Sequence, residues 1–458
     1  MKKIKEMFKT AHSRYGTYST LFTVLAIIIV IVLNLVASKL PESWKNIDLS
    51  RQNLYEITDQ SRKLLKGLDK KVQIHVFADK DAADERIQIF VEKYAGLSSK
   101  VSLKWTNPTT NPTALADYNV SENTILVSCE ESGKSAQIAL TDIILYDEYS
   151  YYYYGTYEET GFDAEGQLTG AVSYVTSDFE ETIYYTSGHG EMEFGKTILS
   201  MLDKSNYTMK ELNTLMLKEI PEDCKLLLLN GPTVDLMESE KDMISAYMQK
   251  GGNVVLFYGA TVEKLPNIDA LMEEYGMNLV DGYVADTQRS HQQIPYYVFP
   301  VMSLSGELAD NMKSQMALLI YARGMKLAEP ARESISVNQF LSTSSYGYAV
   351  TEEAQVQGTY VLGAAATEKG QFTVITTPSM IDEGILTTFG TLENSTLFMN
   401  IINSNFENTI NVSIPAKNLG VTYNTMQYAG VSTLVVIVVI PIAILACGLM
   451  VWFKRRKA

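Results

Sequence analysis

Leu226-Leu227-Leu228-Leu229-Asn230-Gly231-Pro232 and, later, Gly251-Gly252-Asn253-Val254-Val255-Leu256-Phe257-Tyr258-Gly259-Ala260 decide the fold of the second half of this chain. Each is a continuous apolar run that ends in a turn, which is typical of a strand buried on both faces of a parallel sheet. Between them, Met243 to Met248 carry apolar residues at helical spacing. Strand, helix and strand in this order predict a doubly wound α/β fold.

The same pattern continues upstream, where Thr182 to Tyr185 predicts a strand and Phe194 to Leu202 predicts a helix. In doubly wound sheets, ligands lie beyond the carboxyl ends of the strands, where the strand order reverses. Three strand ends therefore predict one ligand-binding crevice. Its candidate residues are Gly188, His189, Gly190, Glu191, Asn230, Gly231, Pro232 and Gly259. The structural alternative is that these glycines serve only tight strand-to-helix turns.

A smaller α/β unit precedes this one. Val72 to Phe77, Val101 to Trp105 and Thr124 to Ser128 alternate as strands do, and Asp84 to Tyr94 is mostly helical in its spacing. The order suggests a thioredoxin-like outline without the Cys-x-x-Cys of thiol redox chemistry. The tyrosine-rich run from Tyr146 to Tyr157 follows neither period and predicts a linker, with a recognition loop for a sugar or a protein as the alternative.

The two ends of the chain are apolar. Leu21 to Val36 and Leu434 to Trp452 match the hydrocarbon thickness of a bilayer, and basic residues flank both on the outer side. By the positive-inside rule they predict a two-pass protein of the cell membrane with both termini cytoplasmic and the central domains extracellular or periplasmic. A cleaved signal peptide is the alternative for the first segment, although its apolar core is longer than usual.

These observations divide the chain into seven parts. They are a basic tail over residues 1–20, a transmembrane helix over 21–40, a small α/β domain over 44–145, a tyrosine-rich linker over 146–164, a doubly wound α/β domain with an insertion over 165–425, a second transmembrane helix over 431–453 and a basic tail over 454–458.

Composition and motifs exclude several function classes. The net charge of −15 argues against nucleic-acid binding. His75, His189 and His291 lack the spacing of a zinc site, and no P-loop motif occurs, so we expect neither a metal nor a cofactor. Cys129 and Cys224 do not lie on a Gly-x-Cys-x-Gly turn, and no Gly-x-Ser-x-Gly occurs, so we expect no nucleophilic catalysis.

The order of short motifs resembles a known family. Asp48 to Thr58, Tyr185 to Glu191, Asn230 to Pro232, Lys250 to Gly252 and Trp452 to Arg456 resemble the GldG-like proteins, the gliding-motility auxiliary family of ABC transporters. The resemblance implies an auxiliary subunit that works with a separate permease and ATP-binding subunit, without an established substrate. It also implies a sheet domain similar to the flavodoxin-like and glutamine-amidotransferase-like group.

Two functions follow from the sequence. The first is a non-catalytic, membrane-anchored auxiliary subunit of an ABC transport system, whose central domains bind a substrate or a cell-surface partner while its helices dock a permease. The alternative is a membrane-tethered hydrolase of the amidotransferase-like group that uses His189 and Glu191. The missing nucleophile favours the first. Thr376 to Ser379 also departs from the Gly-Asp-Ser-like strand end that the family would have there.

Overall fold

The computed structural model describes residues 53–147, 155–177, 180–259, 264–389, 391–406, 414–419, 435–442 and 444. Its contacts divide the chain into two units, Met1–Glu56 and Ile57–Ala458. Every helix and strand named below lies in the second unit.

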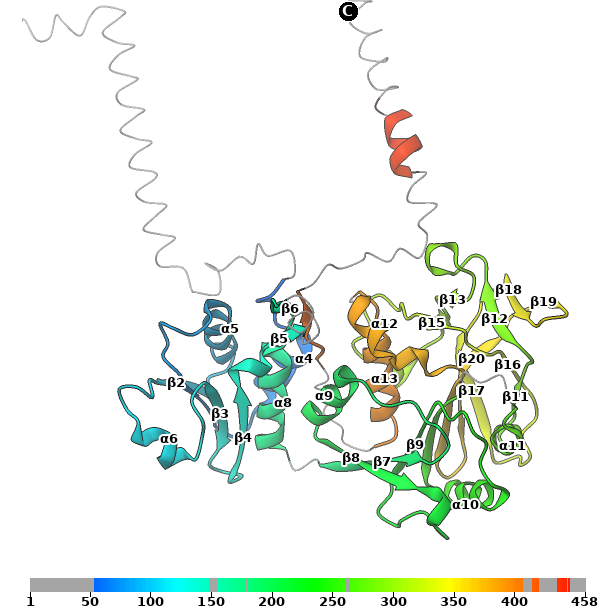
Figure 1. The fold of residues 1–458 in the computed structure, drawn as a ribbon, viewed down its shortest axis with the longest axis horizontal. Helices are drawn as coiled ribbons and strands as arrows, with labels where there is room; N and C mark the ends of the chain where they lie inside the picture. The colour runs from blue at the N-terminus through cyan, green and yellow to red at the C-terminus, as the bar shows by residue number, and fades with distance from the viewer. Residues whose placement is uncertain are drawn as a thin grey trace, which may run out of the picture. The chain divides into compact units, whose positions relative to one another are not determined.

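A small α/β structure forms the first half of this unit (Figure 1). Its elements are α4 (Asp59–Gly67), β1 (Val72–Phe77), α5 (Glu85–Ala95), β2 (Val101–Thr106), α6 (Thr113–Tyr118), β3 (Thr124–Cys129), β4 (Lys134–Ala139) and the short 3-10 helix η1 (Leu140–Asp142). The sheet order is β2-β1-β3-β4, with β1 and β2 parallel and the other pairs antiparallel. This is a thioredoxin-like arrangement, and His75 is packed inside it, 1% exposed.

One buried helix joins the two halves. It is α8 (Ala164–Thr176), which follows the hairpin of β5 (Ile144–Asp147) and β6 (Glu158–Phe162) and packs on β3 and β4. Glu165, in its first turn, accepts hydrogen bonds from the Thr58 amide at 2.6 Å and the Ser61 hydroxyl at 2.6 Å. Asp163 precedes the helix and accepts from Lys204 Nζ at 2.9 Å. The hydrogen bonds to Glu165 attach the start of α4 to α8. The ion pair of Asp163 attaches the larger sheet domain, to which Lys204 belongs, to the start of the same helix.

The larger domain contains a ten-stranded sheet. Its first elements are β7 (Glu181–Ser187), α9 (Lys196–Lys204), β8 (Tyr207–Asn213), η2 (Thr214–Met216), β9 (Leu226–Asn230), α10 (Glu238–Gln249), β10 (Asn253–Phe257) and α11 (Pro266–Glu274), and β21 (Gln371–Ile375) is added later in the chain. The five parallel strands lie in the order β8-β7-β9-β10-β21. Numbered along the chain, this is the flavodoxin-like order 2-1-3-4-5, and it reverses between β7 and β9.

Helices cover both faces of this sheet because its central strands are apolar throughout. All five residues of β9 are buried. Leu226 and Leu228 belong to one core cluster, with residues of α9 and α13 (Asn394–Asn403), whereas Leu227 and Leu229 belong to another, with residues of α10 and α11. Successive side chains of a strand point to opposite faces, so a continuous apolar run has a core on each side.

The segment between α11 and β21 adds antiparallel strands to the large sheet and forms two smaller sheets. Its elements are β11 (Met277–Leu279), β12 (Tyr283–Asp286), η3 (His291–Gln293), β13 (Tyr297–Val298), β14 (Val301–Met302), η4 (Gly306–Ala309), β15 (Leu319–Ile320), β16 (Met325–Leu327), β17 (Ser336–Ser342), β18 (Gly347–Val350), β19 (Gln355–Gln357) and β20 (Val361–Thr367). After β21 come η5 (Pro378–Ile381), α12 (Glu383–Thr388), α13, β22 (Lys417–Asn418) and η6 (Val435–Val439). Strand β22 returns to pair with β6.

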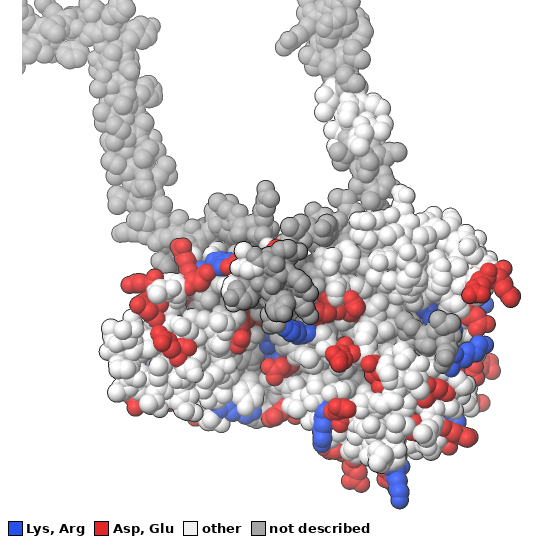
Figure 2. Space-filling view, in the orientation of Figure 1, with Lys and Arg blue, Asp and Glu red and all other residues white. Residues whose placement is uncertain are grey.

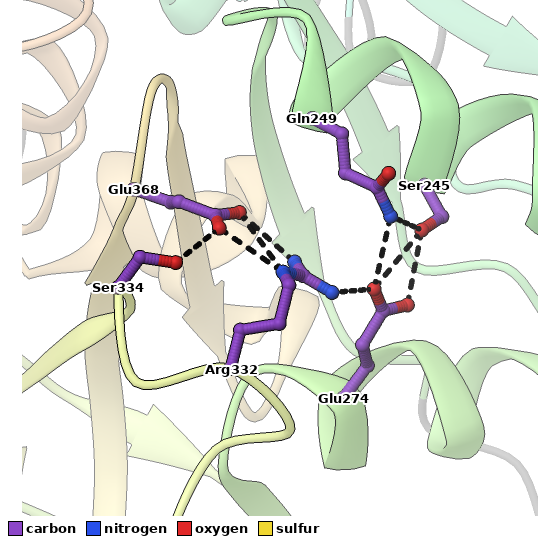
Figure 3. A network of polar contacts seen from close by, with 6 residues as sticks. All are labelled: Ser245, Gln249, Glu274, Arg332, Ser334 and Glu368. Atoms are coloured by element: carbon purple, nitrogen blue, oxygen red, sulfur yellow. Dashed lines mark hydrogen bonds and ion pairs between the residues drawn. The ribbon is translucent and has the colours of Figure 1, made fainter.

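Arg332 fixes this insertion to the rest of the domain (Figure 3). Its guanidinium donates to Glu274 at the end of α11 and, at 2.9 Å, to Glu368 in the turn between β20 and β21. Glu274 in turn accepts from Ser245 of α10 at 3.0 Å. The guanidinium also lies 5.2 Å from the ring centre of Tyr275. Arg332 therefore joins α11 directly, and α10 through Glu274, to the turn between β20 and β21.

The predicted fold class needs one correction. The α/β part agrees with the structure, but no helix in the described residues is long and apolar enough to cross a membrane, so the prediction of two transmembrane helices and of a two-pass membrane localisation is wrong on this finding. The first predicted span, over 21–40, lies outside the described residues. Of the second, only 435–442 and 444 are described. The prediction rested on hydropathy, whereas a span also requires about 20 helical residues.

Candidate functional site

The loops after β7 and β9 meet at the point where the strand order reverses. The Met192 amide donates to the Asn230 carbonyl at 2.8 Å, and Asn230 Nδ2 donates back to the Met192 carbonyl at 2.7 Å. The amides of Thr233 and Val234 both donate to the His189 carbonyl at 2.9 Å. The structure thus brings the segments 188–191 and 230–232 together, as the parallel-sheet argument predicted. That they bind a ligand stays a prediction.

Glycines allow these loops to approach each other closely. A Cβ on Gly259 would lie 1.8 Å from the Pro232 carbonyl oxygen, and one on Gly190 would lie 2.3 Å from Thr233 Oγ1. Gly190 also has φ +67°, a left-handed conformation that favours glycine. A Cβ on Gly231 would lie 3.0 Å from the Cβ of Pro378, which follows β21. Close packing between loops therefore explains these glycines, in line with the structural alternative.

His189 lies beneath the loops between two carboxylates. The side chain is 2% exposed. Its Nε2 is 3.1 Å from Glu240 Oε2, and its Nδ1 is 3.5 Å from Glu191 Oε1. The other oxygen of Glu191 accepts from the His189 amide at 2.7 Å, and Glu240 accepts from the Met237 amide at 2.9 Å. Both ring nitrogens of His189 thus face a carboxylate of this chain.

The electrostatics favour the charged form of all three groups. The Glu191 carboxylate, and Glu240 after it, raise the pKa of His189 above its ordinary value, although burial acts in the opposite direction. Burial raises the pKa of the Glu191 carboxyl, but the hydrogen bonds from the His189 ring and amide outweigh it and lower that pKa to about 2. The pKa of Glu240 is also lowered, because the nearby Thr214 hydroxyl, the Met237 amide and His189 together outweigh burial.

This arrangement does not favour general-base or nucleophilic catalysis. A general base needs a neutral nitrogen within hydrogen-bond reach of a substrate proton. His189 is protonated more readily than an ordinary histidine, its Nε2 lies within hydrogen-bond distance of Glu240, and its Nδ1 faces Glu191 at 3.5 Å. Cys224 offers no nucleophile either, because burial raises the pKa of its thiol to about 11. In the part of the chain that the structure describes, no three His, Cys, Asp or Glu side chains are placed to hold a metal ion.

Exposed apolar side chains occur in the two segments that pack against the loop of the buried His189. Leu215 and Met216, in η2 after β8, are 41% and 85% exposed, and Val234 and Met237, between β9 and α10, are 57% and 58% exposed. A Cβ on Gly188 would lie 3.0 Å from Leu215, and one on Gly190 would lie 3.9 Å from Val234. These two side chains therefore lie next to the two glycines that flank His189. We call the four residues the apolar rim.

The sequence analysis missed Glu240 and the apolar rim. The spacing of Asp235 and Glu238 is typical of a helix cap, but α10 begins at Glu238 after Met237, and Glu240 closes the cap. Asp235 instead accepts from the Asn267 and Ile268 amides at 2.9 and 3.2 Å, in the first turn of α11. Glu240, an acidic residue three positions after Met237, has the spacing of a capping box, and this spacing was the sequence signal for the contact.

Comparison with known proteins gives limited structural likeness. The mmIFT52 N-terminal domain is 19% identical over 49% of this chain and 97% of its own, with a TM-score of 0.38. PurLQS from Thermotoga maritima is 14% identical over 49% of this chain and 99% of its own, with a TM-score of 0.30. A glutamine amidotransferase from the same organism is 12% identical over 50% and 99%, with a TM-score of 0.31. With TM-scores below 0.5, these likenesses decide nothing about function.

Comparison of the sequence with protein families is more informative than the structural likenesses. No curated protein matches the chain. Residues 51–145 match a family described as a domain of unknown function. Residues 180–305, which include both loops and the apolar rim, match a family described as an ABC-type uncharacterized transport system. This match confirms the predicted resemblance to the GldG-like auxiliary family of ABC transporters over residues 180–305.

Proposed function

We propose that this chain is a non-catalytic auxiliary subunit of an ABC transport system and that the apolar rim docks another protein subunit of that system. The observation that carries the proposal is the exposure of four apolar side chains around the switch-point loops, inside the segment that matches the transport family. The permease and the ATP-binding subunit are the candidate partners.

The composition of the rim supports a protein partner. Met216 is 85% exposed, and Val234 and Met237 are more than half exposed. Contiguous apolar groups on a surface mark interaction sites, and methionine adapts its shape to a partner. Burying such side chains removes apolar area from water and contributes about 25 cal/mol per Å² before the costs of association.

The loops themselves favour a protein over a small molecule. Their direct hydrogen bonds, such as that from the Met192 amide to the Asn230 carbonyl, join the two loops at the strand ends where ligands lie in doubly wound sheets. Ser187 Oγ and Asn230 Oδ1 are buried and have no hydrogen-bond partner within the described residues, so this region still favours a bound polar group. A partner that packs on the exposed rim, outside these loops, is compatible with the direct hydrogen bonds between them.

Catalysis receives less support. The alternative hydrolase would use His189 and Glu191, but His189 faces Glu191 and Glu240 with both ring nitrogens. An ion cluster of this kind fits a structural role, because it fastens the loop after β7 to the first turn of α10. We therefore keep the non-catalytic function.

The test is co-purification from the native source. The tagged full chain is isolated in mild detergent, and stoichiometric partners are identified by mass spectrometry. We expect a permease and a P-loop ATPase with the unmodified chain and their loss from the double variant Met216→Glu with Val234→Glu. Val356→Glu is the matched control, because Val356 is 55% exposed, close to the 57% of Val234, but belongs to β19.

Two results would contradict the proposal. One is a chain that is isolated alone, and the other is a double variant that retains its partners at the level of the control. Equal thermal unfolding temperatures of the two variants show that the added charges act at the surface.

A further inference from the structure

Three tyrosines of the insertion form a second notable cluster. Tyr296 and Tyr321 are stacked, with ring centres 4.4 Å apart and planes at 14°, while Tyr283 meets Tyr321 edge-on at 5.5 Å. Tyr321 is 49% exposed. One face of its ring lies on Tyr296, and about half of the residue remains open to solvent. The cluster therefore presents an aromatic surface to solvent, at the end of the domain that holds β12, β13 and β15 (Figure 1).

The backbone of this cluster adopts an uncommon conformation. Tyr321 has φ +49°, and Gln292 and Gln293, in the loop that leads to Tyr296, have φ +49° and +62°. Residues other than glycine rarely occupy this left-handed region, and bulky residues do so least often. Such strain persists only where the surrounding structure enforces it, and it concentrates at binding sites. Both glutamines are exposed, and each amide can donate and accept hydrogen bonds.

Buried polar groups enforce the conformation of the loop. Asp286 is fully buried, and its carboxylate accepts from the amides of Gln288 at 3.0 Å, Arg289 at 2.9 Å and Ser344 at 2.7 Å. Arg289 Nε donates to the Phe299 carbonyl at 2.9 Å. The His291 ring packs 5.1 Å from that of Phe389. The loop is thus held in place before any ligand arrives, which lowers the entropy cost of binding.

The two stretches of chain that carry Tyr296 and Tyr321 contain few charged residues, and the nearby Arg323 packs on Tyr258. Residues 287–300 contain one formal charge, Arg289, whose guanidinium bonds to backbone carbonyls, and residues 317–322 contain none. Figure 2 shows a broad area without charged side chains where Figure 1 places β13 and β15. A neutral ligand suits such a surface, because a charged one would lose hydration without gaining a partner.

We propose that Tyr321, supported by Tyr296 and Tyr283 and accompanied by the amides of Gln292 and Gln293, is a binding platform for a neutral carbohydrate. The C–H face of a pyranose ring is apolar and slightly positive, and it complements the negative face of an aromatic ring. Its hydroxyl groups both donate and accept, as amides do. This site is separate from the docking of a transport subunit at the apolar rim.

Isothermal titration calorimetry of the full chain tests the proposal, with β-1,4-linked glucose tetramer as the probe and a proline-rich peptide as the competing class. We expect millimolar or tighter binding of the tetramer and an affinity at least about tenfold lower for Tyr321→Ala, because the stacking face is lost. Tyr321→Phe keeps the ring and should stay within about threefold of the unmodified chain.

The matched control is Tyr346→Ala, because Tyr346 is 45% exposed and belongs to the same insertion. Its binding should equal that of the unmodified chain. Tyr321→Leu keeps apolar bulk without a π face, so it separates stacking from any loss of folding in Tyr321→Ala. Absence of binding to the tetramer, unchanged binding in Tyr321→Leu, or binding of the peptide alone would overturn the proposal.

Discussion

His189 shows how a single residue can be essential to a loop without chemistry. Its ring lies between Glu191 and Glu240, and removal of one partner from a buried charge cluster costs about 3–5 kcal/mol. We expect His189→Gln to lower the free energy of unfolding by up to this amount, as measured by urea denaturation. A change below about 0.5 kcal/mol, the range of ordinary surface substitutions, would contradict the cluster's structural role.

The pH dependence of the same cluster has a defined sign. The pKa of His189 is raised in the folded chain, so its contribution is complete below its unfolded pKa of about 6.5 and is lost as pH rises through the folded value. The pKa of Glu191 is lowered to about 2, so its contribution is complete above about pH 4.5 and is lost as pH falls toward 2. The stability difference between the unmodified chain and His189→Gln should be largest between about pH 4.5 and 6.5. Urea denaturation at pH 5.5, 7 and 8.5 measures it, and a difference that grows with pH would contradict this sign.

Gly259 offers a purely steric prediction. A Cβ there would lie 1.8 Å from the Pro232 carbonyl oxygen, so Gly259→Ala must displace the loop after β9. We expect destabilisation of at least about 1–3 kcal/mol, as in other overpacked sites. Gly67→Ala is the control, because nothing lies within 4 Å of that Cβ, and thermal unfolding compares the two. Equal unfolding temperatures would show that the loop has room.

The residues of the candidate site were partly predictable. Gly188 to Glu191 and Asn230 to Pro232 could be placed together, because parallel strands end at one edge of a sheet. Glu240 could not, because its contact with His189 joins residues far apart in the chain and depends on how α10 is positioned. The rim residues could not either, because an exposed Met216 and a buried Met248 look alike in a sequence.

At the scale of the elements, a buried ion pair joins the start of α8 to the end of α9. Lys204 Nζ lies 2.9 Å from both carboxylate oxygens of Asp163, and both residues are buried. Lys204→Met leaves a buried carboxylate without its partner and should cost about 3–5 kcal/mol. Adding Asp163→Asn should recover much of that loss. A double-mutant cycle by urea denaturation measures it, and additive effects would contradict a direct coupling.

The predicted elements succeed where the apolar pattern is long. The strand from Leu226 to Leu229 and the helix around Met243 to Met248 appear as β9 and α10, because each buries an uninterrupted stripe. Most of the insertion was not resolved into elements from the sequence. Its strands β13, β14 and β15 have two residues each, too short to show a period of two, and tertiary contacts alone define them.

On the scale of the whole unit, α8 belongs to the packing of both sheets. It packs on β3 and β4 and also on α9, and Leu168 within it is fully buried. We expect Leu168→Ala to cost about 2–5 kcal/mol and to raise hydrogen exchange in both β1 and β9. Hydrogen exchange with mass spectrometry measures this, with the exposed Leu199, 42% exposed, changed to Ala as the control. Faster exchange in β1 alone would mean that the two halves unfold separately.

The return of β22 to β6 has a mechanical consequence. Thr58, near the start of the unit, and Lys417, near its last described strand, both lie against Glu165, at 2.6 and 3.7 Å. A pull applied between these two points is resisted first by the β5-β6-β22 ribbon and the first turn of α8. The load passes between them without crossing the ten-stranded sheet. The loops that hold His189 therefore lie outside the path of a force applied between Thr58 and Lys417.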